Sequence, residues 1–240
     1  MDITKLTRPA RKVLKLKRCG AVIVAAGNAS RMEGIDKVMA PLGGEPVIKR
    51  TVRAFETCDA IGEIVVVTRE DQLVAVSELC GEFKKVTAVV VGGRSRVESV
   101  QNGLNALSDK VKLAAIHDGA RPFATWQMID RVVRAANSYG AAAPAVPVKD
   151  TIKEVAGGIV KATPDRSALR AVQTPQVFDF DLLRGALKKA ILEEAKITDD
   201  CSAIENMGMS VKIVEGDERN IKITTPLDLK MAELIWEEMQ

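Results

Sequence analysis

Short apolar runs alternate along the chain with segments whose apolar residues recur at helical spacing. Three runs are apolar almost throughout and two are weaker: Gly20–Ala25, Glu63–Thr68 and Val86–Val91, then Leu113–His117 and Ala141–Val146. Runs that are apolar on both faces are typical of parallel strands covered on both sides. The helical spacing predicts helices between them, at Pro46–Cys58, Ser95–Leu107 and Thr125–Ser138. Alternation of this kind predicts right-handed strand–helix–strand units.

The fold class that follows is α/β: an open, mostly parallel, Rossmann-like sheet with helices on both faces, which binds ligands beyond the C-terminal ends of its strands. The pattern breaks at Pro147, where two alternating stretches flank the turn signal Ala156-Gly157-Gly158. This predicts a protruding β-hairpin arm at about residues 148–165, which is too small to bury a core alone. An arm of this kind usually packs on a partner subunit. Later elements are predicted at Asp179–Glu194, Thr198–Met207, Ser210–Glu215 and from Pro226 onward.

Composition and charge narrow the classes of protein. Of the 240 residues, 47% are apolar and 28% charged, which is typical of a globular chain. Residues 1–18 hold seven basic side chains and one acidic side chain, so we divide the chain into a basic N-terminal extension, 1–18, and a single domain, 19–240. The slightly acidic remainder and the 3% aromatic content argue against nucleic-acid binding. No apolar stretch reaches the ~20 residues of a membrane span, and the four scattered cysteines fit reduced thiols in the cytoplasm.

The loop after the first predicted strand carries the clearest chemistry. It runs from Ala25 through Gly27 to Arg31 and Met32, with Lys37 shortly after. Small residues let backbone N–H groups approach a phosphate chain, while arginine and lysine side chains neutralise it. The loop lacks the glycines and the Gly-Lys-Ser/Thr ending of a P-loop, and two of the three glycines of a dinucleotide-binding loop. It therefore predicts nucleotide binding of another type.

Seven stretches in register make the chain resemble the 2-C-methyl-D-erythritol 4-phosphate cytidylyltransferase family of the non-mevalonate isoprenoid pathway. After the first loop they are Gly92–Val100, His117–Pro122, Pro147–Thr151, Asp165-Arg166, Gln173–Gln176, Ile197–Asp200 and Glu215-Gly216 through Lys222. The resemblance implies transfer of the cytidylyl group of CTP to a polyol phosphate, with Mg²⁺ as cofactor and release of pyrophosphate. It also implies a homodimer joined through the β-arm.

The resemblance also implies roles for individual residues. The residues implied to bind CTP are Ala25, Ala26, Gly27, Gly93, Ser99, Asp118 and Gly119, where the small residue at 119 leaves room for the nucleotide. The residues implied to surround the acceptor phosphate are Arg121, Thr151, Arg166, Thr198 and Lys222, of which Thr151 and Arg166 lie on or beside the arm that reaches the neighbouring subunit's site. Catalysis falls to Arg31, Lys37 and Lys222, and Asp118 is the candidate metal ligand. Charge neutralisation, without an essential general base, is expected to supply the rate.

Several points stay open at this stage. Asp36 replaces the proline that usually precedes the lysine, and it could weaken the grip of Lys37 by pairing with it. His117, the only histidine, is expected to be structural, while Arg96 is either a surface charge or a support for the nucleotide loop. The alternatives are a ribitol 5-phosphate cytidylyltransferase, a nicotinamide-dependent oxidoreductase and a nucleotide-binding regulator without activity.

Overall fold

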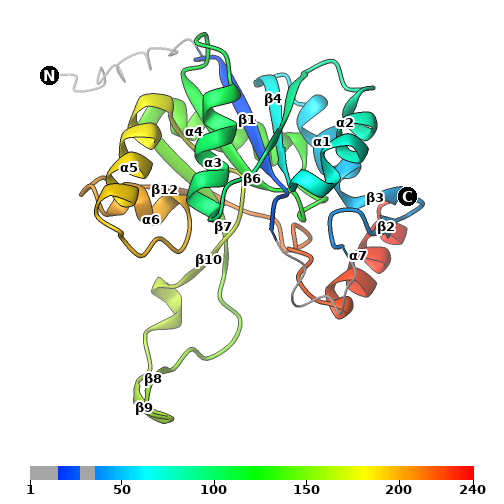
Figure 1. The fold of residues 1–240 in the computed structure, drawn as a ribbon. Coiled ribbons are helices and arrows are strands. Elements are labelled where there is room, and N and C mark those ends of the chain that lie inside the picture. Colours follow the sequence, from blue (N-terminus) through cyan, green and yellow to red (C-terminus); the bar gives the residue numbers. More distant parts are fainter. Residues whose placement is uncertain (1–15, 28–35) are drawn as a thin grey trace, which may run out of the picture.

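The computed structural model describes residues 16–27 and 36–240, in which an eight-stranded sheet is the central layer (Figure 1). The strand order is β10-β7-β11-β6-β1-β4-β5, and β12 pairs with β7. Pairing is parallel among β5, β4, β1 and β6 and between β7 and β12, whereas β11 and β10 run antiparallel to their neighbours. The strands are β1 (Cys19–Val24), β4 (Ile61–Thr68), β5 (Val86–Val91), β6 (Leu113–Asp118), β7 (Ala141–Pro147), β10 (Arg170–Val172), β11 (Gln176–Asp179) and β12 (Lys212–Glu215).

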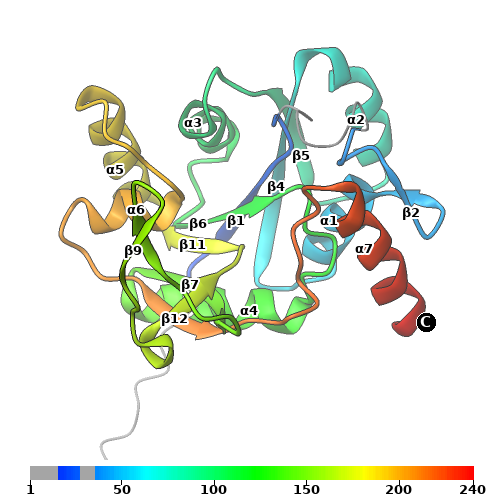
Figure 2. The ribbon, with the colours of Figure 1, turned by 90° about the horizontal axis from the view of Figure 1, so that it is seen from below.

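Helices cover both faces of the sheet, as the sequence predicts (Figure 2). One face carries α3 and α5, and the other carries α4. The helices are α1 (Val47–Glu56), α2 (Leu73–Cys80), α3 (Arg96–Ala106), α4 (Trp126–Tyr139), α5 (Phe180–Leu192), α6 (Asp200–Glu205) and α7 (Pro226–Glu238), with 3₁₀ turns η1 (Glu70–Gln72) and η2 (Arg166–Ala168). The sequence did not predict α2, the short hairpin of β2 (Pro41–Leu42) and β3 (Glu45–Pro46), or the antiparallel strands β10 and β11.

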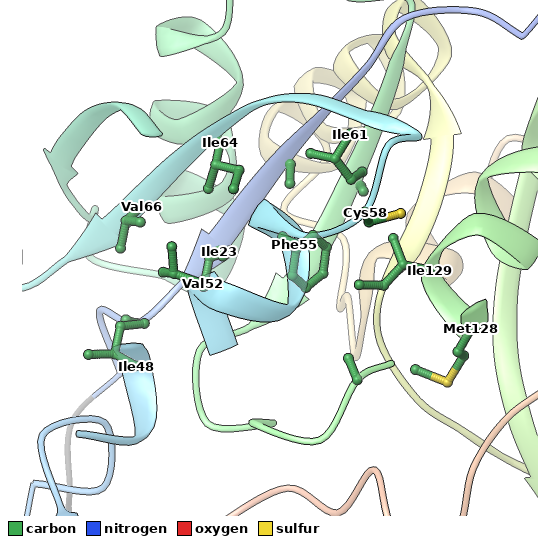
Figure 3. Packing of buried hydrophobic residues seen from close by; sticks show 14 of the residues in the cluster. Ile23, Ile48, Val52, Phe55, Cys58, Ile61, Ile64, Val66, Met128 and Ile129 are labelled. Atoms are coloured by element: carbon green, nitrogen blue, oxygen red, sulfur yellow. The ribbon is translucent and has the colours of Figure 1, made fainter. Parts of the chain in front are cut away.

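Two hydrophobic clusters hold these layers together, one on each face. On β1, Ala21 and Ile23 belong to one cluster and Val22 to the other, since successive side chains of a strand point to opposite faces. Figure 3 shows the first cluster, in which α1 directs Ile48 and Phe55 toward the sheet. Both faces of β1 are therefore buried, which explains its uninterrupted apolar sequence.

The helix boundaries follow from local capping groups. The side chain of Ser95 accepts a hydrogen bond from Glu98 N at the start of α3, and that of Thr125 accepts one from Met128 N at the start of α4. Asp199 and Thr225 form capping boxes at α6 and α7, and Pro226 occupies the first turn of α7. These caps satisfy backbone N–H groups that a helix leaves unpaired at its N-terminus.

The predicted arm is a hairpin of β8 (Glu154–Ala156) and β9 (Ile159–Ala162), which extends away from the sheet and its helices (Figure 1). Its turn residues Gly157 and Gly158 have φ values of 57° and 78°, as a two-residue hairpin turn requires. The exposed side chains of the arm include Val155, Ile159 and Val160.

The division between an extension, 1–18, and a domain, 19–240, stays a prediction, since most of the extension lies outside the described residues. Its last residues contact the domain: Lys17 Nζ lies 2.9 Å from Asp179 Oδ2, and the carbonyl of Arg18 accepts hydrogen bonds from Lys112 N and Leu113 N. Among the described residues, no helix has the length and apolar character needed to cross a membrane.

Candidate active site

A cavity of about 400 Å³ opens where β1 and β6 reach their C-terminal ends. The loops that follow β1 and β5 form its other walls, and Lys222 approaches from the segment before α7. Its lining residues are Val24, Ala25, Ala26, Gly27, Lys37, Val38, Gly93, Arg94, Ser95, Arg96, Ser99, Asp118, Ala120 and Lys222. The topology thus brings together the candidate residues Ala25–Gly27, Lys37, Gly93, Ser99, Asp118 and Lys222 at the edge of the sheet where α/β proteins bind ligands.

In its described part, the loop after β1 contributes the small residues Ala25, Ala26 and Gly27 to the cavity wall, together with Lys37. The loop is anchored by Ala25 N, which donates a hydrogen bond to Val67 O at 2.7 Å. The side chain of Lys37 lies over this loop, because a Cβ placed on Gly27 would be only 3.8 Å from Lys37 Nζ. Arg31, the other cation predicted for this loop, lies outside the described residues.

The carboxylate of Asp36 is bound by groups of the turn that follows β4 and by the backbone after Lys37. Its Oδ2 accepts hydrogen bonds from Arg69 Nη1 at 2.7 Å and from Gln72 Nε2 at 2.5 Å, while Oδ1 accepts from Val38 N at 3.0 Å. Asp36 thereby ties the backbone on both sides of Lys37 to the turn that follows β4. The residue that replaces the expected proline is therefore an anchor.

The opposite wall depends on two contacts at the start of α3. Ser99 Oγ accepts a hydrogen bond from Gly93 N at 3.1 Å and donates one to Ser95 O at 2.8 Å. A Cβ at Gly93 would lie 2.2 Å from Glu98 Cβ, so only glycine lets the loop approach the helix this closely. Ser99 therefore shapes the wall of the cavity through its hydroxyl.

Asp118 is the electrostatic centre of the site. Its side chain is 9% exposed, with Arg96 Nη1 2.8 Å from Oδ1 and Lys222 Nζ 2.9 Å from Oδ2, and Arg121 Nε lies 3.5 Å from the same Oδ2. Burial opposes ionisation, but the positive charges of Arg96, Lys222 and Arg121 hold the pKa of the Asp118 carboxyl well below its ordinary value. The cavity therefore contains a permanent carboxylate surrounded by cations.

Arg96 is not a free surface charge. Its other terminal nitrogen, Nη2, lies 2.8 Å from Asp200 Oδ2, so one guanidinium joins a strand-end carboxylate to one at the first position of α6. Asp200 is 2% exposed, and burial raises the pKa of its carboxyl. Arg96 acts in the opposite direction, because its positive charge favours the ionised carboxylate. The sequence showed Asp200 only as part of a motif, because nothing in a linear sequence pairs residues 104 positions apart.

Gly119 has a packing role in the structure. A Cβ there would lie 3.0 Å from Ala25 Cβ and 3.1 Å from both Ile48 Cδ1 and Val24 O. The protein itself fills the space that a side chain at position 119 would occupy, so the packing favours glycine there. The predicted contact of Gly119 with the nucleotide stays a prediction. The glycine lets β6 and the loop after β1 approach each other behind the cavity.

A chain of hydrogen bonds runs behind Asp118 through the only histidine. Asp118 N donates to Thr174 Oγ1 at 3.1 Å, Thr174 Oγ1 lies 3.0 Å from His117 Nδ1, and His117 Nε2 lies 3.1 Å from Arg121 O. A carbonyl oxygen only accepts hydrogen bonds, so Nε2 carries the proton and donates to Arg121 O, while Nδ1 accepts a hydrogen bond from the hydroxyl of Thr174. Burial lowers the pKa of His117 to about 4, which keeps the ring neutral. His117 therefore has the structural surroundings that the sequence analysis expected.

The other acceptor candidates lie in three places. Arg121 is close to the cavity: its side chain is 13% exposed and donates to Asn220 O at 2.6 Å. Thr151 and Arg166 are exposed at the base of the arm, where Arg166 Nη1 donates to Lys149 O at 2.7 Å, and neither lines the cavity. Thr198 lies just before α6, with its N–H donating to Ser202 Oγ at 3.1 Å.

A strand-edge cavity with a backbone-lined loop, a central carboxylate and converging cations is the kind of site expected in a nucleotidyltransferase of the α/β class. Comparison with known sequences gives the family. The model of the family described as IspD, 2-C-methyl-D-erythritol 4-phosphate cytidylyltransferase, matches residues 19–238. The chain belongs to this family.

Curated relatives agree with this assignment over nearly their whole length. The 2-C-methyl-D-erythritol 4-phosphate cytidylyltransferase of Symbiobacterium thermophilum is 45% identical over 219 residues, with 90% of this chain and 92% of that protein covered. The enzyme of the same name from Geobacillus kaustophilus is 46% identical over 218 residues, with coverage of 90% and 95%.

Solved structures share the fold. A 4-diphosphocytidyl-2C-methyl-D-erythritol synthase from Anaerococcus prevotii superposes with a TM-score of 0.85 at 31% identity, covering 93% of this chain and 98% of that chain. A 2-C-methyl-D-erythritol 4-phosphate cytidylyltransferase from Thermus thermophilus gives a TM-score of 0.75 at 31% identity, with coverage of 90% and 98%.

Proposed function

We propose that this chain transfers the cytidylyl group of CTP to 2-C-methyl-D-erythritol 4-phosphate, forming 4-diphosphocytidyl-2-C-methyl-D-erythritol and pyrophosphate. The observation that carries the proposal is the cavity at the ends of β1 and β6, where a glycine-containing loop faces Lys37 and Lys222. This arrangement suits two phosphate groups that must approach each other although both are negatively charged.

CTP would occupy the cavity with its triphosphate along Ala25, Ala26 and Gly27, whose small side chains allow close approach of the backbone. Gly93 and Ser99 lie in the opposite wall, which suits the cytosine end. The cavity volume of about 400 Å³ lies within the range of small-molecule sites.

The chemistry needs an aligned nucleophile more than it needs a base. A phosphate oxygen of the acceptor attacks the α-phosphorus of CTP, a new P–O bond forms, and the bond to pyrophosphate breaks. The nucleophile is already an anion, so Lys37, Lys222 and Arg31 would act by neutralising charge and aligning the two phosphates. The neutral, hydrogen-bonded His117 supports this proposal, because it has no free nitrogen to serve as a base.

We propose that the cofactor is a divalent metal ion, namely Mg²⁺. Within residues 16–27 and 36–240, no group of three or more His, Cys, Asp or Glu side chains could hold a metal ion. The donor set fits Mg²⁺ bound mainly through nucleotide phosphates, because this ion commonly takes only one or two protein carboxylates. Asp118, ionised and facing the cavity, is the carboxylate that would hold it. When bound, the ion withdraws charge from the phosphate oxygens.

The acceptor phosphate would lie beside Arg121, Thr198 and Lys222. We propose that Thr151 and Arg166 of a partner subunit complete this half of the site in a homodimer. Two observations support the dimer. Both residues are exposed at the base of an arm that extends away from the sheet and its helices (Figure 1), and the arm exposes Val155, Ile159 and Val160. We also propose a cytoplasmic location, which the four free, buried cysteines support.

The test is a pyrophosphate-release assay with purified protein, CTP and Mg²⁺. The acceptors are 2-C-methyl-D-erythritol 4-phosphate, ribitol 5-phosphate and none, and mass spectrometry identifies the product. Release with the first acceptor is expected, and its absence would contradict the proposed function. Lys37→Ala should lose most turnover, whereas Lys188→Ala, an exposed lysine on α5, should keep it. Full turnover by Lys37→Ala would contradict the mechanism.

A further inference from the structure

The bridge made by Arg96 between two carboxylates has a geometry that goes beyond charge pairing. Nη1 and Nη2 each lie 2.8 Å from a different carboxylate, Asp118 on β6 and Asp200 on α6. A guanidinium is planar and rigid, so its two terminal nitrogens fix the two carboxylates relative to each other. A lysine side chain, with one nitrogen, has no such fork.

Asp200 is the rigid end of this bridge. It opens α6 directly after Asp199, whose side chain caps the helix through Ser202 N. Gln176 on β11 holds the same turn from the other side: its Nε2 donates to Asp199 Oδ2 at 2.7 Å and its Oε1 accepts from Cys201 N at 3.0 Å. The buried Asp200 carboxylate is therefore fixed to the sheet, and Arg96 is held by it.

The other end of the bridge is in the cavity itself. Asp118 shares its two oxygens between Arg96 on one side and Lys222 on the other. If the charge of Asp200 were absent, both nitrogens of Arg96 would be free to pair with Asp118, because bidentate arginine–carboxylate pairs are strong. Arg96 would then compete with Lys222 for the oxygen that Lys222 now contacts.

We propose that Asp200 is a positioning residue for the transfer reaction. It holds Arg96 in the cavity wall, so that Arg96 restrains Asp118 without displacing Lys222. This inference rests on the proposed function. Asp200 also joins the two halves of the site. Thr198 of the acceptor half is two residues before Asp200, and Arg96 belongs to the cavity wall of Gly93 and Ser99, which we call the nucleotide wall.

A double-mutant cycle tests the proposal with Asp200→Asn, Arg96→Lys and the double variant. Each single variant should lower kcat by about 10- to 100-fold, the size of effect that a misplaced group causes. Because Asp200 acts through Arg96, the double variant should be no slower than Arg96→Lys alone. Losses that multiply would overturn the proposal. Glu205→Gln removes an exposed carboxylate from the same helix and should leave kcat unchanged.

Two further measurements separate positioning from folding. Urea unfolding shows whether a variant is folded, and kcat is compared only among folded chains. Asp200→Glu restores the carboxylate on a longer side chain and should recover part of the lost kcat. If Asp200→Glu is folded and recovers no kcat, the result counts against positioning. If Asp200→Asn does not fold, Asp200→Glu takes its place in the double-mutant cycle. A wild-type chain without turnover refutes the proposed function, whereas an active wild type with multiplying losses refutes only the role of Asp200.

Discussion

Gly103 lies on α3 where the helix packs on β1 and β4, and the change Gly103→Ala tests how closely the nucleotide wall is seated on the sheet. A Cβ there would lie 2.3 Å from Val22 Cγ1 and 2.8 Å from Val67 Cγ2. Both valines are fully buried, and β-branched side chains have little freedom to turn away. Either the helix or the sheet must therefore move.

The magnitude follows from two opposing effects. Replacing glycine by alanine inside a helix stabilises the fold by about 1 kcal/mol, whereas overpacking a core costs about 1–3 kcal/mol. Contacts this short place the cost at the upper end, which leaves a net destabilisation of about 2 kcal/mol. For a chain of this size, that lowers Tm by about 4–8 °C.

The assay is thermal unfolding followed by circular dichroism, with Gly185→Ala as the matched control. Gly185 lies inside α5 with nothing within 4 Å of a new Cβ, so this change should raise the free energy of unfolding by about 0.5–1 kcal/mol. Gly103→Ala should also raise the KM for CTP, because a displaced α3 moves Ser95 and Arg96. Equal stabilisation by both changes would refute the packing argument.

Three further outcomes are expected. Burial lowers the pKa of His117 to about 4 from its ordinary 6.5, so between these pH values the unfolded chain binds a proton that the folded chain does not. The free energy of unfolding should therefore be highest above pH 6.5 and decline as the pH falls toward 4. Urea unfolding should show a weaker decline for His117→Gln. Co-expressed Lys37→Ala and Arg166→Ala subunits should recover about one quarter of wild-type activity, since half the dimers would hold one intact site; no recovery despite mixed dimers seen by native mass spectrometry contradicts shared sites. Asp36→Asn should lower kcat several-fold by releasing Arg69 from the loop that holds Lys37, and unchanged kcat argues against an anchoring role.

The sequence predicted the parallel half of the sheet well. Val86–Val91 matches β5 without correction, and the predicted strands at β1, β4, β6 and β7 differ by only one or two residues at their ends. These strands are long and apolar on both faces, so a local pattern suffices. By contrast, β10 has three residues and β11 four. Their strand form depends on pairing with distant segments, β10 with β7 and β11 with both β6 and β7.

The site was predictable where its residues lie in contiguous stretches and hidden where contacts join distant segments. The loop of Ala25–Gly27, Gly93 and Asp118 were all found from sequence and line one cavity. The bridge of Arg96 to Asp200 and the anchor of Asp36 on Arg69 were not, since each depends on the packing of separate elements. The packing of Gly119 against Ala25 and Ile48 was hidden for the same reason, since these residues come together only in the fold.

The strand order has a consequence for how the enzyme matures during synthesis. The neighbours β5, β4, β1 and β6 are all made within the first half of the chain, so the nucleotide wall can form while later segments are still being translated. Lys222, by contrast, follows β12, and α6 supplies Asp200 only after the arm is complete. The nucleotide wall can thus form before Lys222 and Asp200 have been made, and the capacity for transfer arrives last.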